Sequence, residues 1–341
     1  MTHRIGLLSA VLAVALIVPV AGAQTHHQHG FLWTAAGGMQ DLGVPTGWTD
    51  SFAAAISKSG LVVGSLLSDA TGKATAAAWT AKNGWQPLKK GLSAQYSAVT
   101  AVNGSQQIVG VTYTTGTTQH AFLWTPTGGM QDLGTLGGDF SVAYGINKVG
   151  EVVGYSTTTA GSYHAFLWTQ SSGMQDLGAL DAGSNSGSVA YAINDNGTIV
   201  GGSTRTNGHG VAVFWANGQI HILSALATNP ASSAIAINKL DQIVGADSVP
   251  KSQDTNAFLW TQTGGLQDLG FIGGWPSGSA SGVNSSGEVV GYDIMPSNGL
   301  QQAFVWTSSG GIQGLGTLGG PSSVASGIND SGQVVGVSDV P

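Results

Sequence analysis

Three closely spaced histidines after the apolar start of the chain form a candidate metal site. His26, His27 and His29 follow a segment that we predict to be cleaved after Ala23. Cleavage would free the amine of Gln24, and an amine, two backbone amides and an imidazole form the planar nitrogen set that Cu(II) or Ni(II) prefers. Cyclisation of Gln24 would block that amine. A tail without a metal is therefore the default expectation, and the sequence indicates no other cofactor.

Histidine and aspartate also recur at fixed places further along the chain. The recurring histidines, each just before an apolar run, are His29, His120 and His164. The recurring aspartates, each between Gln and Leu, are Asp41, Asp132, Asp176 and Asp268. Such recurrence could build a ring of metal ligands. Because the short Asp side chain also bonds neighbouring backbone amides, we favour a structural use, with the histidines as polar residues at strand edges.

The motifs of common enzymes are missing or lack their context. The chain has no Cys and no G-x-S-x-G motif, and Glu occurs only at Glu151 and Glu288. A G-x-G-x-x-G match at residues 314–319 is followed by a strand-like run, whereas nucleotide binding needs a helix there. We assign no catalytic residue. Hydrolysis or elimination by paired loop aspartates stays open as an alternative, with no pair singled out.

Aromatic side chains recur at a nearly constant offset after a glycine, in segments that vary between repeats. The candidate ligand-binding residues are these aromatics and polar residues near them: Trp48, Asp50, Tyr96, Asp139, Phe140, Arg205 and Trp275. Aromatic rings beside Asp or Arg suit stacking on sugars or gripping a peptide. The alternative, which we favour slightly, is that the rings cover the edge of the core.

An internal repeat sets the secondary structure that carries these residues. Seven tryptophans, at positions 33, 79, 124, 168, 215, 260 and 306, are 44 to 47 residues apart. Each unit contains four short apolar runs bounded by Gly, Asn, Ser or Thr, which is typical of strands. An Asn with Gly three residues later joins the last two runs in several units, as at Asn147 and Gly150, and suits a tight turn.

Seven four-stranded units predict an all-β fold, the seven-bladed β-propeller. An open solenoid is the rival, but solenoids usually need atypical polar caps, and the terminal units here look like interior ones. In a propeller, the short connections within each unit fall on one face and the longer, variable connections on the other. Ligands usually bind such variable loops. The expected domain covers residues 31–341, after a flexible His-rich tail over residues 24–30.

Composition and the leader limit the possible partners and compartments. The chain carries 17 acidic and 10 basic residues, a net charge of −7, which argues against nucleic-acid binding. Residues 1–23 combine Arg4, an apolar run and an Ala-Gly-Ala ending, as in a signal peptide. We therefore expect an exported protein, extracellular or periplasmic, that is not held in a membrane after cleavage and is a monomer.

The repeat resembles a known family. The run from His120 to Thr125, the Gly-Gly-Met-Gln-Asp-Leu-Gly that follows, and Gly145-Ile146-Asn147 with Gly154 are similar to the bacterial extracellular HAF repeat. The likeness covers all seven units, although the second and fifth depart from the pattern. It implies a secreted or surface repeat protein and transfers no catalytic residue.

These observations together favour a secreted, non-catalytic binding or adhesion scaffold for a glycan or protein ligand on the face with longer loops. Two alternatives remain: a secreted polysaccharide hydrolase or lyase that uses loop aspartates, and a purely architectural surface repeat. A binder predicts an aromatic pocket on the face with longer loops, and an enzyme predicts two carboxylates with perturbed pKa in the central channel. An architectural protein predicts neither.

Overall fold

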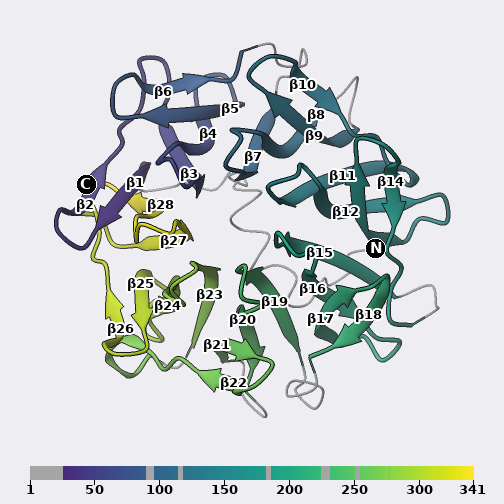
Figure 1. The fold of residues 1–341 in the computed structure, drawn as a ribbon. Coiled ribbons are helices and arrows are strands. Elements are labelled where there is room, and N and C mark those ends of the chain that lie inside the picture. Colours follow the sequence, from purple (N-terminus) through teal and green to yellow (C-terminus); the bar gives the residue numbers. More distant parts are fainter. Residues whose placement is uncertain are drawn as a thin grey trace.

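The computed structural model describes residues 26–89, 96–113, 118–181, 186–223, 231–249, 254–275 and 277–341. Its strands form seven four-stranded antiparallel blades around a central channel, which confirms the predicted β-propeller (Figure 1). Two neighbouring blades join into one eight-stranded sheet through a single parallel bridge between Phe140 and Gln119. The predicted signal peptide, residues 1–23, lies outside the described residues. In the described ranges, no helix is long and apolar enough to cross a membrane.

Each blade runs from an innermost strand beside the channel to an outermost strand at the rim. The innermost strands are β3 (Asp50–Ile56), β7 (Ser97–Val102), β11 (Gly137–Ile146), β15 (Gly187–Ile193), β19 (Ser232–Ile237), β23 (Ser277–Val283) and β27 (Ser323–Ile328). The second strands are β4 (Val62–Ser68), β8 (Ile108–Tyr113), β12 (Val152–Thr158), β16 (Ile199–Thr204), β20 (Ile243–Ser248), β24 (Val289–Ile294) and β28 (Val334–Asp339).

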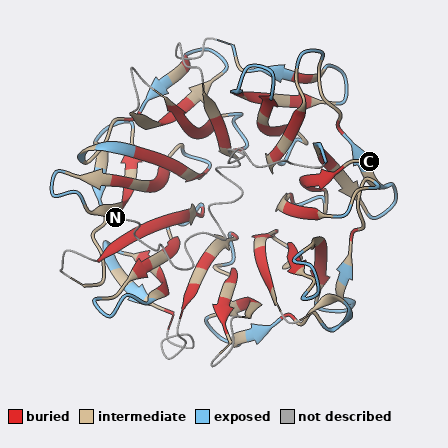
Figure 2. Cartoon of the chain, turned by 180° about the vertical axis from the view of Figure 1, so that it is seen from behind, coloured by how far each residue is buried: buried red, intermediate tan, exposed pale blue. Residues whose placement is uncertain are grey.

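The two outer positions of each blade hold the aromatic motif and the short strand that follows it. The third strands are β1 (Gln28–Thr34), β5 (Lys73–Thr80), β9 (Gln119–Thr125), β13 (Tyr163–Thr169), β17 (Gly210–Ala216), β21 (Thr255–Thr261) and β25 (Gln301–Thr307). The outermost strands are β2 (Gly38–Asp41), β6 (Gly84–Pro87), β10 (Gly129–Asp132), β14 (Gly173–Asp176), β18 (Gln219–Ile222), β22 (Gly265–Asp268) and β26 (Gly311–Gly314). The second strands are the most buried and the outermost strands at the rim the most exposed (Figure 2).

The ring is closed by a blade that both ends of the chain share. β1 pairs antiparallel with β28, in a register that runs from Gln28 opposite Asp339 to Trp33 opposite Val334. This blade has the order β2-β1-β28-β27, so each sequence repeat contributes its halves to two adjacent blades. Residues 28–30, which we placed in the flexible tail, belong to β1 because they pair with the end of β28.

Alternation of strand direction sorts the connections onto two faces. Turns such as β1–β2 and β3–β4 lie on what we call the short-turn face, and connections such as β2–β3 and β4–β5 lie on the long-loop face. In the β3–β4 type of turn, the fourth residue has a positive φ in each blade. It is Gly in five blades, but Gln106 and Asp241 hold the same left-handed conformation, which is less favourable for residues with a Cβ.

A glycine is required on the second strand of every blade. A Cβ added at Gly64 would lie 1.8 Å from the carbonyl oxygen of Phe52, and the equivalent glycines face the same contact at 1.9 to 2.0 Å. Opposite this glycine, the neighbouring innermost strand changes register, between Ala53 and Ala55 in the β3–β4 pair. The bulge therefore pushes a carbonyl into space that only glycine leaves free, which explains the recurring Val-Val-Gly.

Hydrogen bonds from Asn side chains join successive blades on the short-turn face. In each bond, the Nδ2 of the turn Asn donates to the backbone carbonyl at the equivalent position of the next blade, at 2.8 to 3.4 Å. The donors are Asn103, Asn147, Asn194, Asn238, Asn284 and Asn329. The last donor reaches the carbonyl of Ser57, which holds the Asn position in the first repeat.

Serine hydroxyls form a second series of bonds between blades. The Oγ atoms of six innermost-strand serines accept backbone N–H groups from the third strand of the preceding blade at 2.8 to 3.0 Å. These serines are Ser51, Ser97, Ser141, Ser188, Ser232 and Ser323. The core lies between blades, where Phe31, Phe122 and Phe166 are fully buried. Packing and polar bonds thus act on the same blade interfaces.

We predict that Asn238→Ala lowers the free energy of unfolding by about 2–4 kcal/mol. The substitution removes the bonds from Nδ2 to the Asn284 carbonyl and to Gln242, and it leaves two backbone N–H groups without their Oδ1 acceptor. Chemical denaturation measures the effect. Asn83→Ala is the matched control, because Asn83 lies in an exposed turn, and an equal loss in both variants would contradict the role of the Asn ring.

Candidate functional site

The central channel is a cavity of about 260 Å³ lined by residues of the innermost strands and by Tyr292. Its described lining is apolar or carries hydroxyl groups, and it contains no charged side chain. Tyr144 packs against Tyr191 and Tyr155, with ring centroids 5.4 Å and 6.0 Å apart. Burial raises the pKa of Tyr144 and Tyr191 well above the ordinary phenol value, so these hydroxyls stay neutral.

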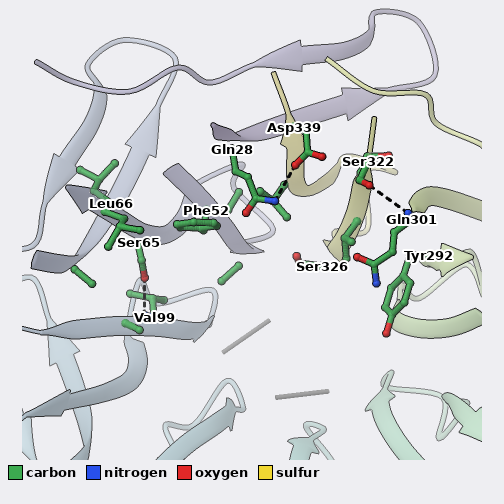
Figure 3. A pocket seen from close by; sticks show the side chains of 18 of the residues that line it. Gln28, Phe52, Ser65, Leu66, Val99, Tyr292, Gln301, Ser322, Ser326 and Asp339 are labelled. Carbon is green, nitrogen blue, oxygen red and sulfur yellow. Dashed lines mark hydrogen bonds between the residues drawn. The ribbon is translucent and has the colours of Figure 1, made fainter. Parts of the chain in front are cut away.

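A second cavity, of about 130 Å³, opens beside the channel towards the long-loop face (Figure 3). We call it the seam cleft, because strands from both ends of the chain line it: Gln28 of β1, Ser326 of β27 and Asp339 of β28. Gln301 and Tyr292 come from the preceding blade. Ala54, Tyr292 and Ser326 line both the seam cleft and the central channel, so the two cavities adjoin.

Hydrogen bonds within the protein hold the polar groups of the seam cleft in place. The Nε2 of Gln28 donates to Oδ1 of Asp339 at 2.8 Å, as Figure 3 shows. The Oε1 of Gln28 is buried and lacks a hydrogen-bond partner. The backbone N–H of Gln301 donates to Ser322 Oγ at 3.3 Å, which fixes the start of β25. The cleft therefore offers an unused acceptor beside oriented amide and hydroxyl groups.

Of the seven predicted ligand residues, Tyr96 lines the seam cleft and Asp50 is bonded to Gln28 of its wall. Tyr96 lines it, and its ring meets Tyr113 edge-on at 5.2 Å. Burial raises the pKa of Tyr96 to about 12, so its hydroxyl is neutral near pH 7. Asp50 does not belong to the described lining, and its Oδ1 accepts the backbone N–H of Gln28 at 2.7 Å.

The other five predicted ligand residues do not line the cleft. Trp48 is half-buried and packs against a core cluster that includes Leu42 and Trp85. Phe140 is 41% exposed at the start of a different blade, beside the exposed Asp139. Arg205 and Trp275 lie in the connections of further blades. Among the described rings, no contact joins Trp48, Phe140 and Trp275.

The recurring His and Asp residues pair with each other at the rim of the blades. The Nδ1 atoms of His29, His120 and His164 lie 2.8 to 2.9 Å from carboxylate oxygens of Asp41, Asp132 and Asp176. Each of these aspartates also accepts the backbone N–H two residues later, for example Gly43. The predicted bonding of Asp to backbone amides is confirmed, and the pairing with His across twelve residues was missed.

The three histidines of the predicted N-terminal metal set have different surroundings. His29 pairs with Asp41, His27 lies 3.6 Å from Asp50, and His26 is exposed. Gln24 and Thr25, which would supply the amine and amides, fall outside the described residues. The structure thus separates His29 from the other two.

The residues that give the seam cleft its polarity, above all Gln28 and Gln301, were not among the predicted ligand residues. A comparison of the repeats contained a signal, since Gln28, Gln119 and Gln301 hold the same position, two residues before the third-strand Gly or Ala. Their meeting with Asp339 depends on ring closure, which brings residues 311 positions apart into contact.

Asp293 is a buried carboxyl group on β24 with an unusual environment. Its Oδ2 accepts the backbone N–H of Ile272 at 2.6 Å, while its Oδ1 is buried without a partner. Burial raises its pKa to about 7, against the opposing effect of the Ile272 N–H. In three other blades a serine hydroxyl, such as that of Ser156, accepts the equivalent N–H. Gly278 leaves room for the longer group, since a Cβ there would lie 2.2 Å from Oδ1. Asp293 is therefore a variant of a structural position.

We predict that Asp293 makes the fold less stable as the pH rises. Below the unfolded-state value of 3.8 the group is protonated in both states, and between that value and about 7 only the folded state keeps the proton. Stability is therefore lost as pH rises towards and through 7, by on the order of 2 kcal/mol. Chemical denaturation between pH 4 and 8.5 gives the free energy of unfolding at each pH. Its dependence on pH should be weaker in Asp293→Ser than in the wild type. The exposed Asp139→Ser should keep the wild-type slope, and an unchanged slope in Asp293→Ser would refute this assignment.

We also predict that Trp48→Ala destabilises the fold by about 2 kcal/mol, because Trp48 covers the core cluster beside Leu42 and Trp85. The melting temperature measures this. Phe140→Ala, which removes a more exposed ring, should change it little. An unchanged melting temperature in Trp48→Ala would contradict the role of this ring in the core and would favour its use in ligand binding.

Comparisons with known proteins show the fold and no family. No protein-family model matches the chain, and no curated protein matches it. A putative TolB from Agrobacterium tumefaciens is similar in structure at 12% identity, with a TM-score of 0.51, over 93% of this chain and all of that one.

Two further structures agree at the level of the fold. TolB from Acinetobacter baumannii matches at 13% identity and a TM-score of 0.50 over 86% of this chain, which spans only 65% of that protein. The β-propeller domain of the Trilobed protease from Pyrococcus furiosus, described as having an open velcro topology, matches at 10% identity and a TM-score of 0.53, over 81% of this chain and 83% of that one. The chain is a β-propeller, and its resemblance to the HAF repeat stays a prediction.

Proposed function

We propose that this protein is a non-catalytic binding scaffold that holds a neutral, hydroxyl-rich ligand, the terminal sugar of a glycan, in the seam cleft. The observation that carries the proposal is the set of polar groups in the cleft: the amides of Gln28 and Gln301, serine hydroxyls, and the single carboxylate of Asp339. The buried, unpartnered Oε1 of Gln28 needs a donor, and a sugar hydroxyl is one.

The charge and shape of the cleft support a small neutral ligand. No Lys, Arg or His belongs to the described lining, so an anionic ligand would lack a counter-charge. Phe52, Tyr96 and Tyr292 supply aromatic surface for the apolar face of a sugar ring. Pockets for drug-sized molecules usually reach about 300–1,000 Å³, and a cleft of about 130 Å³ suits a single ring.

The alternatives find less support in the described residues. A glycosidase of the common kind needs two carboxyl groups flanking the bond that is cleaved, and Asp339 is the one carboxylate in the described lining of either cavity. A purely architectural repeat gives no reason for an unpartnered polar atom at a cleft. Export through the leader at residues 1–23 is part of our proposal, because it would place the cleft among extracellular or periplasmic glycans.

The proposal predicts that Gln301→Ala weakens binding of a glycan, found by array screening, at least about tenfold, as the loss of one well-placed hydrogen bond in a buried site does. Gln302→Ala is the matched control, because Gln302 is the next residue on β25 and does not line the cleft. Titration calorimetry with the selected glycan compares the two variants. Equal affinities, or capture of a peptide in place of any glycan, would contradict the proposal.

A further inference from the structure

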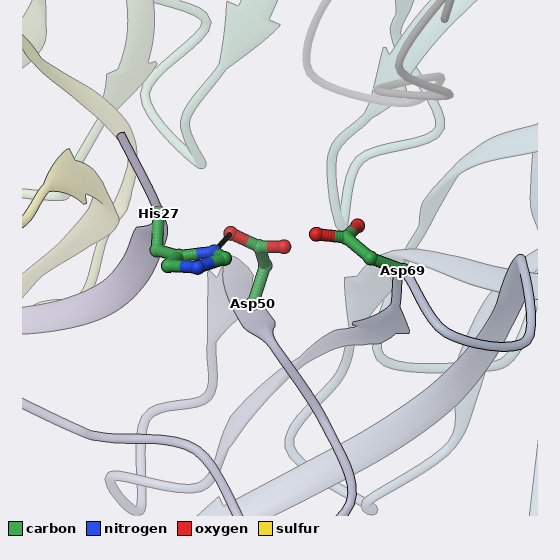
Figure 4. Close-up of side chains that lie close together, drawn as sticks. All are labelled: His27, Asp50 and Asp69. Carbon is green, nitrogen blue, oxygen red and sulfur yellow. Dashed lines mark ion pairs between the residues drawn. The ribbon is translucent and has the colours of Figure 1, made fainter. Parts of the chain in front are cut away.

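Three potential metal ligands meet on the long-loop face where the chain ends close the ring (Figure 4). His27 precedes β1, Asp50 is the first residue of β3, and Asp69 follows β4. One ligand atom from each residue lies within 4.8 Å of the others. Ring closure, rather than a local motif, therefore assembles this cluster.

Asp50 distinguishes this cluster from an ordinary group of surface acids. The residue is only 1% exposed, and its Oδ1 accepts the Gln28 N–H at 2.7 Å and lies 3.6 Å from Nδ1 of His27. Its Oδ2 is buried and has no hydrogen-bond partner. Figure 4 shows the Asp50 carboxylate between the His27 ring and the Asp69 carboxylate. A buried oxygen without a partner is costly, and a cation at this point would remove that cost.

The repeat accounts for one oxygen of the Asp50 carboxylate and not for the other. In two other blades the hydroxyl of Ser277 or Ser322 accepts the backbone N–H equivalent to that of Gln28, so Oδ1 of Asp50 holds a position of the repeat, whereas Oδ2 has no counterpart. The residues equivalent to Asp50, each directly before the innermost-strand Ser or its Gly278 counterpart, are Tyr96, Phe140, Gly187, Ala231, Ser277 and Ser322. None of them is acidic. By contrast, the rim pairs such as His120 and Asp132 recur and have a third partner in a backbone N–H. The second carboxylate oxygen of Asp50 is thus a local departure from the repeat.

The ligand types select a class of metal. Among the described ion pairs, neither Asp50 nor Asp69 has a Lys or Arg partner, so two carboxylates face each other without a fixed counter-charge. One imidazole nitrogen and two carboxylate oxygens suit Zn²⁺, which binds each at roughly 2.0–2.2 Å and often keeps one position open. His27 is 60% exposed and Asp69 is exposed, so both side chains can move the short distance inward that such bonds require.

We propose that His27, Asp50 and Asp69 bind one divalent ion of the Zn²⁺ class, and that this ion fastens the closing strand to the adjacent blade. The ligands are connected to both chain ends. Gln28 donates its backbone N–H to Asp50 and its side-chain amide to Asp339, and the Val340 N–H donates to the His27 carbonyl at 2.9 Å. An ion here therefore stabilises the pairing that closes the ring.

Zinc titration of the purified protein tests the proposal. We expect one Zn²⁺ per chain by calorimetry and a rise of at least about 2 °C in melting temperature at saturation, because the ion binds only the folded state. Asp69→Asn should weaken zinc binding at least about tenfold and leave the melting temperature without zinc almost unchanged, since Asp69 is exposed. His27→Ala should act in the same way.

His26→Ala is the matched control, because it removes a neighbouring exposed histidine and should keep full zinc binding. Equal zinc affinity in Asp69→Asn and the wild type would overturn the proposal. It would also fail if His26→Ala abolished binding, which would assign the metal to the N-terminal tail. Stabilisation by Ca²⁺ or Mg²⁺ in place of Zn²⁺ would contradict the role of the imidazole.

Discussion

The antiparallel pairing of β1 with β28 holds the ring of blades closed. Without it, the chain would be an open row of sheets with unpaired edges at both ends, and exposed edges invite aggregation. With it, six residue pairs from Gln28–Asp339 to Trp33–Val334 join the two ends of the chain, and every blade has a neighbour on both sides. The Asn and Ser bonds between blades can then run almost completely around the ring.

The fold could be predicted because the same structural residues recur in seven repeats. The spacing of Trp, the turn Asn and the Val-Val-Gly run each correspond to one contact: a buried third strand, a bond to the next blade, and a close approach of a carbonyl. The pairing of His29 with Asp41 was harder to predict from the sequence, because residues twelve positions apart come into contact only when the third and outermost strands pair in the observed register.

The seam cleft could be predicted only in part. Aromatic side chains after the outermost strands indicated the long-loop face, and Tyr96 does line the cleft. Trp48 has the same spacing but packs on the core, since the spacing fixes the height of a residue on the blade and not the direction of its side chain. Gln28, Gln301 and Asp339 meet because ring closure brings the two ends of the chain together, and no local pattern records that contact.

Repetition also provides the means to separate structural from functional residues in this chain. A residue type that forms the same hydrogen bond between blades throughout the ring, as Asn238 and Ser141 do, has a structural role. Asp293 departs from its column yet still accepts the N–H that serine accepts elsewhere, so its departure remains structural. Asp50, Gln28 and Asp293 each have a buried oxygen without a hydrogen-bond partner. Asp50 and Gln28 differ from Asp293 in their surroundings, because Asp50 lies beside His27 and Asp69 and Gln28 lines the seam cleft. Both lie at the seam, and it is there that the fold leaves room for a ligand.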